Sequence, residues 1–361
     1  MNDGCRRLVV AFLLMLIGVS CAADTTPEEG FGPMEGDLFV ATHGDDTSPG
    51  TADRPWRTIG HALEQISAGD HLVVGGGIYR ERLVDVSMPD ASPPTPTVIR
   101  AADGQRVVIE GLLWLRGGRH WVLDGIDVTW DPSSNGPDEH MVKVTDGTDW
   151  TVRNGVFFGA RSYAGMLVAG TRDGEPARWE VLGNCIRDTF PTNDVNQDHN
   201  LYVNTGLSAG EGRIEGNVLV GARNGDNLKL GPPGRHGGSV NVLVRHNTLH
   251  RAVQNLVLSG ESSSNRIEGN ILSSTSEGNA SIREYELSGT GNVVRGNLGY
   301  ATTAIIDPSI LESGHGIEDG GGNRSSTDPG FGDEHGCDGL VPDDATAKAY
   351  GHQAWDGAGD H

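Results

Sequence analysis

A short phrase of alternating apolar residues, each copy ending near an asparagine, recurs along most of this chain. The asparagines of the clear copies are Asn184, Asn217, Asn247, Asn270 and Asn297, and two looser copies surround Gly125 and Gly155. Successive copies lie 23 to 33 residues apart. Apolar residues at every second position have the period of a strand, and so short a unit cannot bury its own apolar face. The copies must therefore stack on one another.

A second strand phrase lies between these copies and begins at Asn200, Asn227 and Asn255. Two strand phrases in each unit, with no room for a long helix, predict an all-β parallel β-helix in which each coil lies ~4.8 Å above the last. The leucine spacing of a leucine-rich repeat is absent. We expect the asparagines of the first phrase to form a ladder at a tight turn, because asparagine tolerates the left-handed backbone conformation and its amide can bond the next coil.

The two ends of the repeat region set the predicted domain boundaries. Residues 56–66 place Ile59, Ala62, Leu63 and Ile66 on one face at helical spacing. This pattern predicts a short amphipathic helix that covers the open first coil. The β-helix domain is expected to span residues 38–345, and residues 346–361 are expected to form a C-terminal tail.

The first 21 residues have the parts of an export signal. Arg6 and Arg7 precede an apolar run at 8–17, which is too short to span a bilayer that requires ~20 residues. The following residues, 17–21, resemble a bacterial lipobox, which implies that Cys21 becomes lipidated and anchors the chain to a membrane. Residues 22–37 are then a flexible tether. Export to the outer membrane or cell surface is expected, with periplasmic or secreted protein as the alternative.

Charge and cysteine content narrow the class of partner. Acidic residues outnumber basic ones 49 to 27, which argues against nucleic acid as a partner, since phosphate binding requires clustered lysine and arginine.

After processing, Cys185 and Cys337 would be the remaining thiols, and two thiols so far apart do not predict a disulfide framework. Cys185 lies in a strand phrase and is interpreted as a small core residue. We expect a monomer.

Segments at both ends of the repeat region resemble bacterial pectate-lyase-like right-handed β-helix proteins. Residues 40–51, 54–63, 68–70 and 77–81 resemble the opening of those proteins, and residues 327–331 are similar to their closing segment. This resemblance implies a right-handed parallel β-helix over residues 38–345. The superfamily contains lyases, hydrolases and epimerases, so the resemblance implies the fold more than one activity.

The second strand phrase brings polar residues of different coils together. Its alternation places Lys229 outward, with Tyr202 one coil before it. Lys143 and Arg283 extend this column, and Arg161 and Arg223 lie nearby in register. In an acidic chain, such a line of cations is a candidate site for an anionic sugar.

The chemistry that fits this site is β-elimination or C5-epimerisation of a uronic acid in an acidic polysaccharide. Such a reaction requires a base beside the sugar carboxylate and a cation to stabilise the charge that develops. Lys229 is the candidate base, with its pKa depressed by burial and by Arg223. Tyr202 or His199 would donate to the leaving oxygen, and Arg161, Lys143 and Arg283 would bind substrate. A solvated strand lysine is the alternative for Lys229.

Two further interpretations involve carboxylates. Asp194, Asn196 and Asp198 have the spacing that opens a calcium loop, and Asp226 could contribute from the next coil. A hydrogen-bonded polar loop is the alternative to calcium. Asp198 and Asp226 could instead be the paired carboxylates of a glycoside hydrolase. A non-catalytic β-helix that binds glycan or acts as a surface spacer is the remaining hypothesis.

Overall fold

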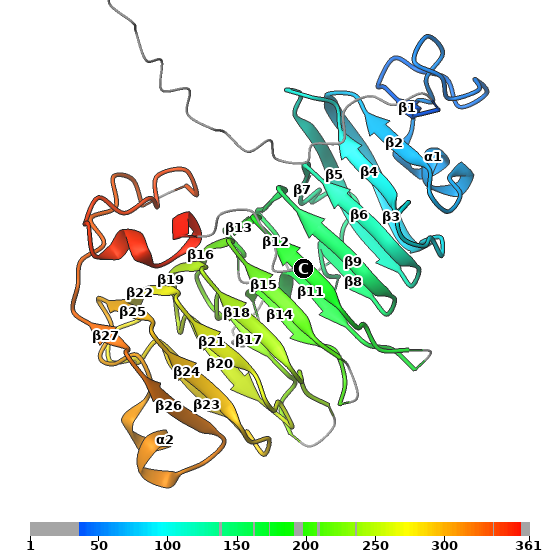
Figure 1. The fold of residues 1–361 in the computed structure, drawn as a ribbon. Coiled ribbons are helices and arrows are strands. Elements are labelled where there is room, and N and C mark those ends of the chain that lie inside the picture. Colours follow the sequence, from blue (N-terminus) through cyan, green and yellow to red (C-terminus); the bar gives the residue numbers. More distant parts are fainter. Residues whose placement is uncertain are drawn as a thin grey trace, which may run out of the picture. The chain divides into compact units, whose positions relative to one another are not determined.

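Successive copies of the repeat form successive coils of a parallel β-helix in the computed structural model (Figure 1). The structure describes residues 36–354 except 137–138, 162, 173, 191–197, 208–209, 235–236 and 335. These residues lie in one unit that spans 34–361. The fold predicted from the repeat is confirmed.

Each coil contributes strands to three columns, two of which join into one sheet through a long strand. The first column is an 11-stranded sheet of β1 (Leu38–Val40), β2 (His71–Val74), β4 (Thr97–Ala101), β6 (Arg119–Asp124), β9 (Thr148–Arg153), β12 (Trp179–Leu182), β15 (Gly212–Glu215), β18 (Val242–Arg245), β21 (Arg266–Glu268), β24 (Asn292–Arg295) and β26 (Ile317–Gly321). The second column contains β7 (Ile126–Thr129), β10 (Val156–Phe158), β13 (Cys185–Arg187), β16 (Val218–Ala222), β19 (Thr248–Ala252), β22 (Ile271–Thr275), β25 (Leu298–Tyr300) and β27 (Arg324–Ser325). The third column contains β8 (Val142–Thr145), β11 (Ala164–Ala169), β14 (His199–Asn204), β17 (Leu228–Leu230), β20 (Leu256–Ser259) and β23 (Ile282–Tyr285). Strand β5 (Val107–Arg116) pairs with β7 and β8 and so joins the second and third columns, and β3 (Gly77–Ser87) pairs with β5.

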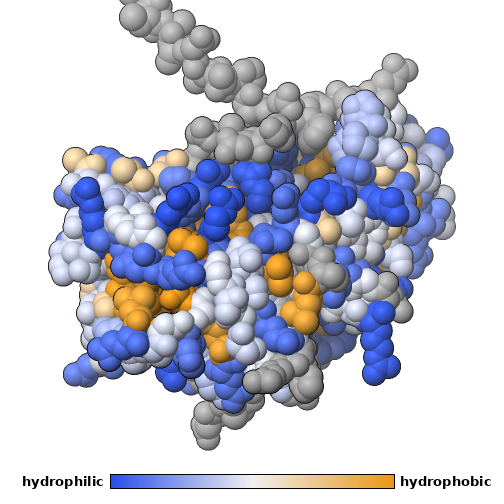
Figure 2. All heavy atoms as spheres, turned by 60° about the horizontal axis from the view of Figure 1, so that its bottom comes forward, coloured by the Kyte–Doolittle hydropathy of each residue, from blue (hydrophilic) through white to orange (hydrophobic). Residues whose placement is uncertain are grey.

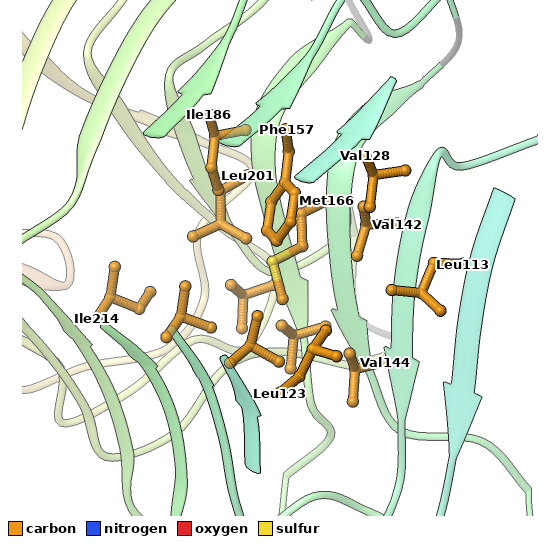
Figure 3. Close-up of a cluster of buried hydrophobic side chains, with 14 of the residues drawn as sticks. Leu113, Leu123, Val128, Val142, Val144, Phe157, Met166, Ile186, Leu201 and Ile214 are labelled. Atoms are coloured by element: carbon orange, nitrogen blue, oxygen red, sulfur yellow. The ribbon is translucent and has the colours of Figure 1, made fainter. Parts of the chain in front are cut away.

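The interior of the solenoid is filled by apolar side chains from every column. In β14, Leu201 and Val203 are fully buried while Tyr202 between them faces outward, as strand alternation requires. Figure 3 shows Leu201 pointing into the same interior as Phe157 and Ile186 of the second column. Because coils stack in register, residues about thirty positions apart in sequence touch along this core.

A ladder of buried asparagines runs along one turn of the solenoid, as predicted. The backbone N–H of each asparagine donates to the side-chain oxygen of the asparagine one coil on, from Asn184 through Asn297 to Asn323. The prediction that these asparagines adopt the left-handed conformation is wrong. The residue before each one does so instead, for example Gly216 at φ 65° and His246 at φ 53°. The left-handed residue makes the turn, and the asparagine then lies inside it.

The predicted capping helix is α1 (Ile59–Gln65). Ile59, Ala62 and Leu63 are buried in the main core, where the helix covers the first coils. The side chain of Thr58 accepts from the backbone N–H of His61 at the N-terminus of the helix. A second short helix, α2 (Pro308–Ser313), contacts β26 near the other end of the solenoid.

A disulfide between Cys185 and Cys337 corrects the interpretation of both cysteines. Their Cα atoms are 6.0 Å apart although 152 residues separate them in sequence. The C-terminal segment folds back along the second column (Figure 1). Leu340 of this segment packs against Val218 and Val220. This contact could not be predicted from the sequence, because the C-terminal segment carries no copy of the repeat phrase that would place it beside a given coil.

The residues predicted to be a C-terminal tail pack on the solenoid as far as residue 354. Two 3₁₀ turns, η1 (Ala347–Ala349) and η2 (His352–Ala354), lie in this segment. Ala347 is fully buried against Ile271 and Leu298. The side chain of His352 hydrogen-bonds that of Thr248, with 2.9 Å between Nδ1 and Oγ1.

Removing the disulfide is expected to destabilise the protein. A Cys185→Ser/Cys337→Ser variant should lose about 2 to 5 kcal/mol of unfolding free energy, because the bond closes a long loop in the unfolded chain. Urea unfolding followed by circular dichroism measures this loss. Unchanged stability in the double variant would show that apolar packing alone holds the C-terminal segment.

The export signal of residues 1–21, including Cys21, and most of the tether lie outside the described residues. Within the part of the chain that the structure describes, no helix is long and apolar enough to cross a membrane. Figure 2 shows one face of the protein, which is largely hydrophilic with small, separated hydrophobic patches. The strongly acidic composition agrees with this surface.

Candidate active site

Outward-facing side chains of the third column stand in register from coil to coil. Tyr202 pairs with Lys229, Lys229 with Val257, and Val257 with Arg283. In the other direction Tyr202 pairs with Leu167, and Leu167 with Lys143. The predicted column is therefore present in the structure. Arg283 pairs with Val257 and so lies at the predicted outward position of the column. Its neighbour Glu284 pairs with the buried Leu258, so this register directs the Glu284 side chain inward.

A cavity of about 560 Å³ opens over the middle of this column. Its lining includes five of the predicted residues, namely His199, Tyr202, Asp226, Lys229 and Arg283. The other lining residues are His140, Tyr163, Pro233, Gln254, Val257 and Tyr285. The structure thus brings the proposed base, donors and one cation to a single pocket.

Several lining residues that the sequence analysis missed precede strands of the third column. His140, Tyr163 and Gln254 each lie within two residues of the start of β8, β11 or β20. His199 and Asp226 hold corresponding places at β14 and β17. The signal that could have found His140 and Gln254 is the register position that they share with His199 and Asp226 at the start of the second strand phrase, and Tyr163 lies one residue earlier in that register. The residue type at this position differs from coil to coil, so no repeated residue marks the position in the sequence.

Lys229 is half-buried and lines the pocket. Its Nζ lies 5.6 Å from the ring centroid of Tyr202 and 6.0 Å from that of Tyr285. Burial lowers the pKa of Lys229, while the carboxyl of Asp226 opposes this shift. A lysine with a lowered pKa is neutral more often and is a more available proton acceptor.

His199 and Asp226 form a buried pair beside the lysine. The backbone N–H of Asp226 donates to Nδ1 of His199 at 3.1 Å, and Oδ2 of Asp226 lies 3.3 Å from the same nitrogen. Burial lowers the pKa of His199 well below its usual value, so the imidazole is neutral. Because Nδ1 accepts a hydrogen bond, the proton of the neutral ring lies on Nε2. Burial also raises the pKa of Asp226 to about 7, against the opposing effect of Lys229.

Two more groups in the pocket keep one protonation state near neutral pH. Burial raises the pKa of Tyr202 to about 12, so its hydroxyl remains a hydrogen-bond donor. Burial lowers the pKa of His140 to about 4, with a smaller effect from Lys143, so its imidazole is neutral. Arg283 is exposed at the edge of the cavity and brings a permanent positive charge.

Comparison with known proteins identifies this architecture. The sequence matches no protein-family model. The pectate lyase PEL9 of Emericella nidulans is 24% identical over 217 residues, which are 55% of this chain and 49% of that protein. The uncharacterized protein YwoF of Bacillus subtilis is 38% identical over 85 residues, or 23% of this chain and 17% of that one. The chain thus spans about half the length of the first relative and less than a fifth of the second.

Solved structures extend the comparison to most of the chain. The crystal structure of pectate lyase Pel9A has a TM-score of 0.57 at 12% identity and covers 83% of each chain. The chain has the pectate-lyase-like β-helix fold. A structure described as a glycoside hydrolase has a TM-score of 0.51 at 9% identity, with 81% of this chain and 96% of that one covered. Identities this low establish the fold alone.

Three of the predicted cations lie outside the pocket of this pectate-lyase-like β-helix. Lys143 lies over the ring of Trp114, with its Nζ 3.6 Å from the centroid. Arg161 and Arg223 both contact the ring of Phe190. The prediction that Arg223 depresses the pKa of Lys229 is therefore replaced, since burial is the principal cause of that shift.

The candidate calcium residues are only partly described. Asp194 and Asn196 lie outside the described residues. Asp198 is buried and accepts a hydrogen bond from Nδ2 of Asn224 at 3.2 Å. Across the described ranges, no group of three or more histidine, cysteine or acidic residues could hold a metal ion. Asp198 is not among the residues that line the pocket, whereas Asp226 is.

Proposed function

We propose that this protein is a carbohydrate-active enzyme that acts on an acidic polysaccharide by β-elimination or C5-epimerisation. The observation that carries the proposal is the half-buried Lys229, with a lowered pKa, in a pocket that also contains Arg283. A neutral lysine beside a fixed positive charge suits proton removal next to a carboxylate. The fold it shares with pectate lyases supports a sugar substrate by analogy.

In the proposed reaction, Lys229 removes the proton on C5 of a uronic acid. Arg283 binds the sugar carboxylate and stabilises the enolate-like charge that develops on it. In β-elimination the C4–O bond breaks, a C4–C5 double bond forms, and Tyr202 or Nε2 of His199 gives a proton to the leaving oxygen. In epimerisation the same donors would return a proton to C5 from the opposite face, with no bond to oxygen broken.

The hydrolase hypothesis receives less support from the pocket. A glycoside hydrolase needs two carboxyl groups that flank the scissile bond. Among the described residues that line the pocket, Asp226 is the sole carboxylic acid. Its buried contact with His199 gives it a positioning role instead.

The proposal is tested by incubating the protein with pectate, alginate and glycosaminoglycans. Ultraviolet absorbance of an unsaturated uronate reports elimination, and exchange of the C5 proton with deuterated solvent reports epimerisation. Each substrate is assayed with calcium and with a chelator, because a calcium site at Asp194, Asn196, Asp198 and Asp226 remains a prediction. Binding without turnover on any substrate would favour the non-catalytic glycan-binding hypothesis.

The pH dependence of turnover should follow the protonation of Lys229. The base acts only when it is unprotonated, so kcat/KM should rise with pH and become constant above the pKa of Lys229. The apparent pKa of this profile should lie below the usual 10.5 of lysine. An Asp226→Asn variant should shift this rise to lower pH, because the Asp226 carboxylate raises the pKa of the lysine. A pH profile measured on both proteins checks the direction. A shift to higher pH would contradict the proposed coupling.

We further propose that the mature protein is an exported monomer with a lipid anchor at Cys21. The Cys185–Cys337 disulfide supports export, since such bonds persist in oxidising compartments. Globomycin-sensitive processing and labelling with a radioactive fatty acid would test the anchor. A Cys21→Ala variant that still incorporates the label would contradict it.

A further inference from the structure

Two arginines and a phenylalanine stack in register beside the pocket. The guanidinium carbon of Arg161 lies 5.8 Å from the ring centroid of Phe190, and that of Arg223 lies 5.1 Å from the same centroid. Both arginines are exposed, and neither lines the pocket itself. The three residues come from three successive coils, and we call them the Arg-Phe-Arg stack.

The backbone fixes this stack by repeating one local conformation three times. In each coil a residue with positive φ lies at the end of the second column: Gly159 follows β10, Asp188 follows β13, and Gly221 is the next-to-last residue of β16. The next residue is fully buried, namely Ala160, Thr189 or Ala222. The following residue, a member of the stack, therefore leaves the core at the same place in each coil. The backbone N–H of Phe190 donates to the carbonyl of Ala160 at 2.8 Å, which holds two of the coils together.

The stack leaves the arginine N–H groups available to a ligand. Neither Arg161 nor Arg223 has an ion-pair partner among the residues that the structure describes. A guanidinium that rests on an aromatic face keeps its N–H donors at the edge, where they can bind a carboxylate in bidentate geometry. Two such groups two coils apart have backbones ~10 Å from each other.

A second stack, formed by Phe158 and Arg187 at the second column and by Arg106 just before β5, provides a comparison. Arg106 and Arg187 lie 6.0 Å and 5.0 Å from the ring centroid of Phe158. Arg106 is paired with Asp127, and Arg187 is paired with Asp188. These arginines already have carboxylate partners within the protein. The Arg-Phe-Arg stack has the same ring contact but no such partner among the described residues.

We propose that the Arg-Phe-Arg stack is a second binding site for carboxylates of the acidic polysaccharide. This inference rests on the proposed function and assigns its substrate class as a polyuronate with carboxylates on neighbouring sugars. Arg161 is two residues from Tyr163, and Arg223 is three residues from Asp226, both of which line the pocket. Each arginine backbone therefore lies within ~11 Å of a pocket residue along the chain. A polymer bound in the pocket reaches the stack, whereas a single uronate does not.

The test compares polymer binding in two pairs of substitutions, each made in a Lys229→Met background so that the ligand is not consumed. Affinity electrophoresis in gels that contain the polyuronates of the activity panel measures the dissociation constant. Arg161→Gln/Arg223→Gln should weaken polymer binding about 10- to 100-fold, because charge-assisted hydrogen bonds are lost. The matched variant Arg106→Gln/Arg187→Gln should change binding less than about 3-fold, since its arginines are already paired.

The outcomes separate this inference from the proposed function. With Lys229 present, the Arg161→Gln/Arg223→Gln variant should raise KM for polymer and leave that for a uronate disaccharide nearly unchanged. If the native protein turns over no substrate but Arg161→Gln/Arg223→Gln weakens polymer binding, the second binding site is supported and the proposed enzymatic function is wrong. Turnover with unchanged polymer binding and KM would overturn the site and leave the enzyme standing. Equal losses of polymer affinity in the two double variants would also overturn the second binding site, because the loss would then follow from the reduced positive charge of the protein.

Discussion

A Lys229→Met variant is expected to lose about 10²- to 10⁴-fold in kcat on the acidic polysaccharide that the native protein turns over. Methionine retains much of the side-chain volume beside Tyr202 but cannot accept a proton. Lys229→Arg should be comparably inactive, because an arginine stays protonated at any working pH. Initial rates from absorbance of the unsaturated product, with circular dichroism to confirm folding, measure both losses.

The control for this loss is Lys348→Met. Lys348 is exposed in η1, outside the pocket, and its replacement should leave kcat within about twofold of the native value. If Lys229→Met retained more than a tenth of the native kcat, another group would have to remove the proton. That result would contradict the role of Lys229 as the base.

An Asn247→Ala variant is expected to lose about 3 to 5 kcal/mol of unfolding free energy. The Asn247 amide accepts from the backbone N–H of Asn217 at 2.9 Å and donates to the carbonyl of Ile214 at 2.7 Å. It also donates to the side-chain oxygen of Asn270 at 3.0 Å. Alanine leaves these groups buried without partners, and each such group costs ~1 to 3 kcal/mol. Urea unfolding measures the change.

A nearby surface substitution controls for general sensitivity of the solenoid. Arg266→Ala removes an exposed side chain on β21, the strand that pairs with β18, and should change stability by less than about 0.5 kcal/mol. Equal effects of the two substitutions would show that the asparagine ladder adds nothing beyond ordinary coil packing. A large loss confined to Asn247→Ala would show that the hydrogen bonds of the ladder stabilise the solenoid.

The periodic part of the fold was predictable because it is a local pattern repeated at nearly constant spacing. Alternation within a phrase set which residues face outward, and repetition set which coils are neighbours. Those two facts together placed Tyr202 against Lys229 and predicted the column as far as Arg283. They also predicted the asparagine ladder, although the turn conformation belongs to the preceding residue.

The parts that escaped prediction lack that periodicity. His140, Tyr163 and Tyr285 reach the pocket from coils where no repeated letter marks their position. The C-terminal segment folds back over the second column through Cys337, a contact that depends on tertiary packing alone. Burial was expected to lower the pKa of Lys229 and is its principal cause, whereas the expected effect of Arg223 is not among the causes. Arg223 lies outside the pocket, because the repeat register does not set where a side chain at a turn points.

The central claim is that stacked coils bring Lys229 and Arg283 to one uronate. The most direct measurement is a crystal structure of the Lys229→Met variant with an acidic oligosaccharide from the preferred polymer. The account predicts a sugar carboxylate in contact with Arg283 and the C5 hydrogen of that sugar directed at residue 229. An oligosaccharide bound on another face, or in the pocket with its carboxylate turned away from Arg283, would contradict it.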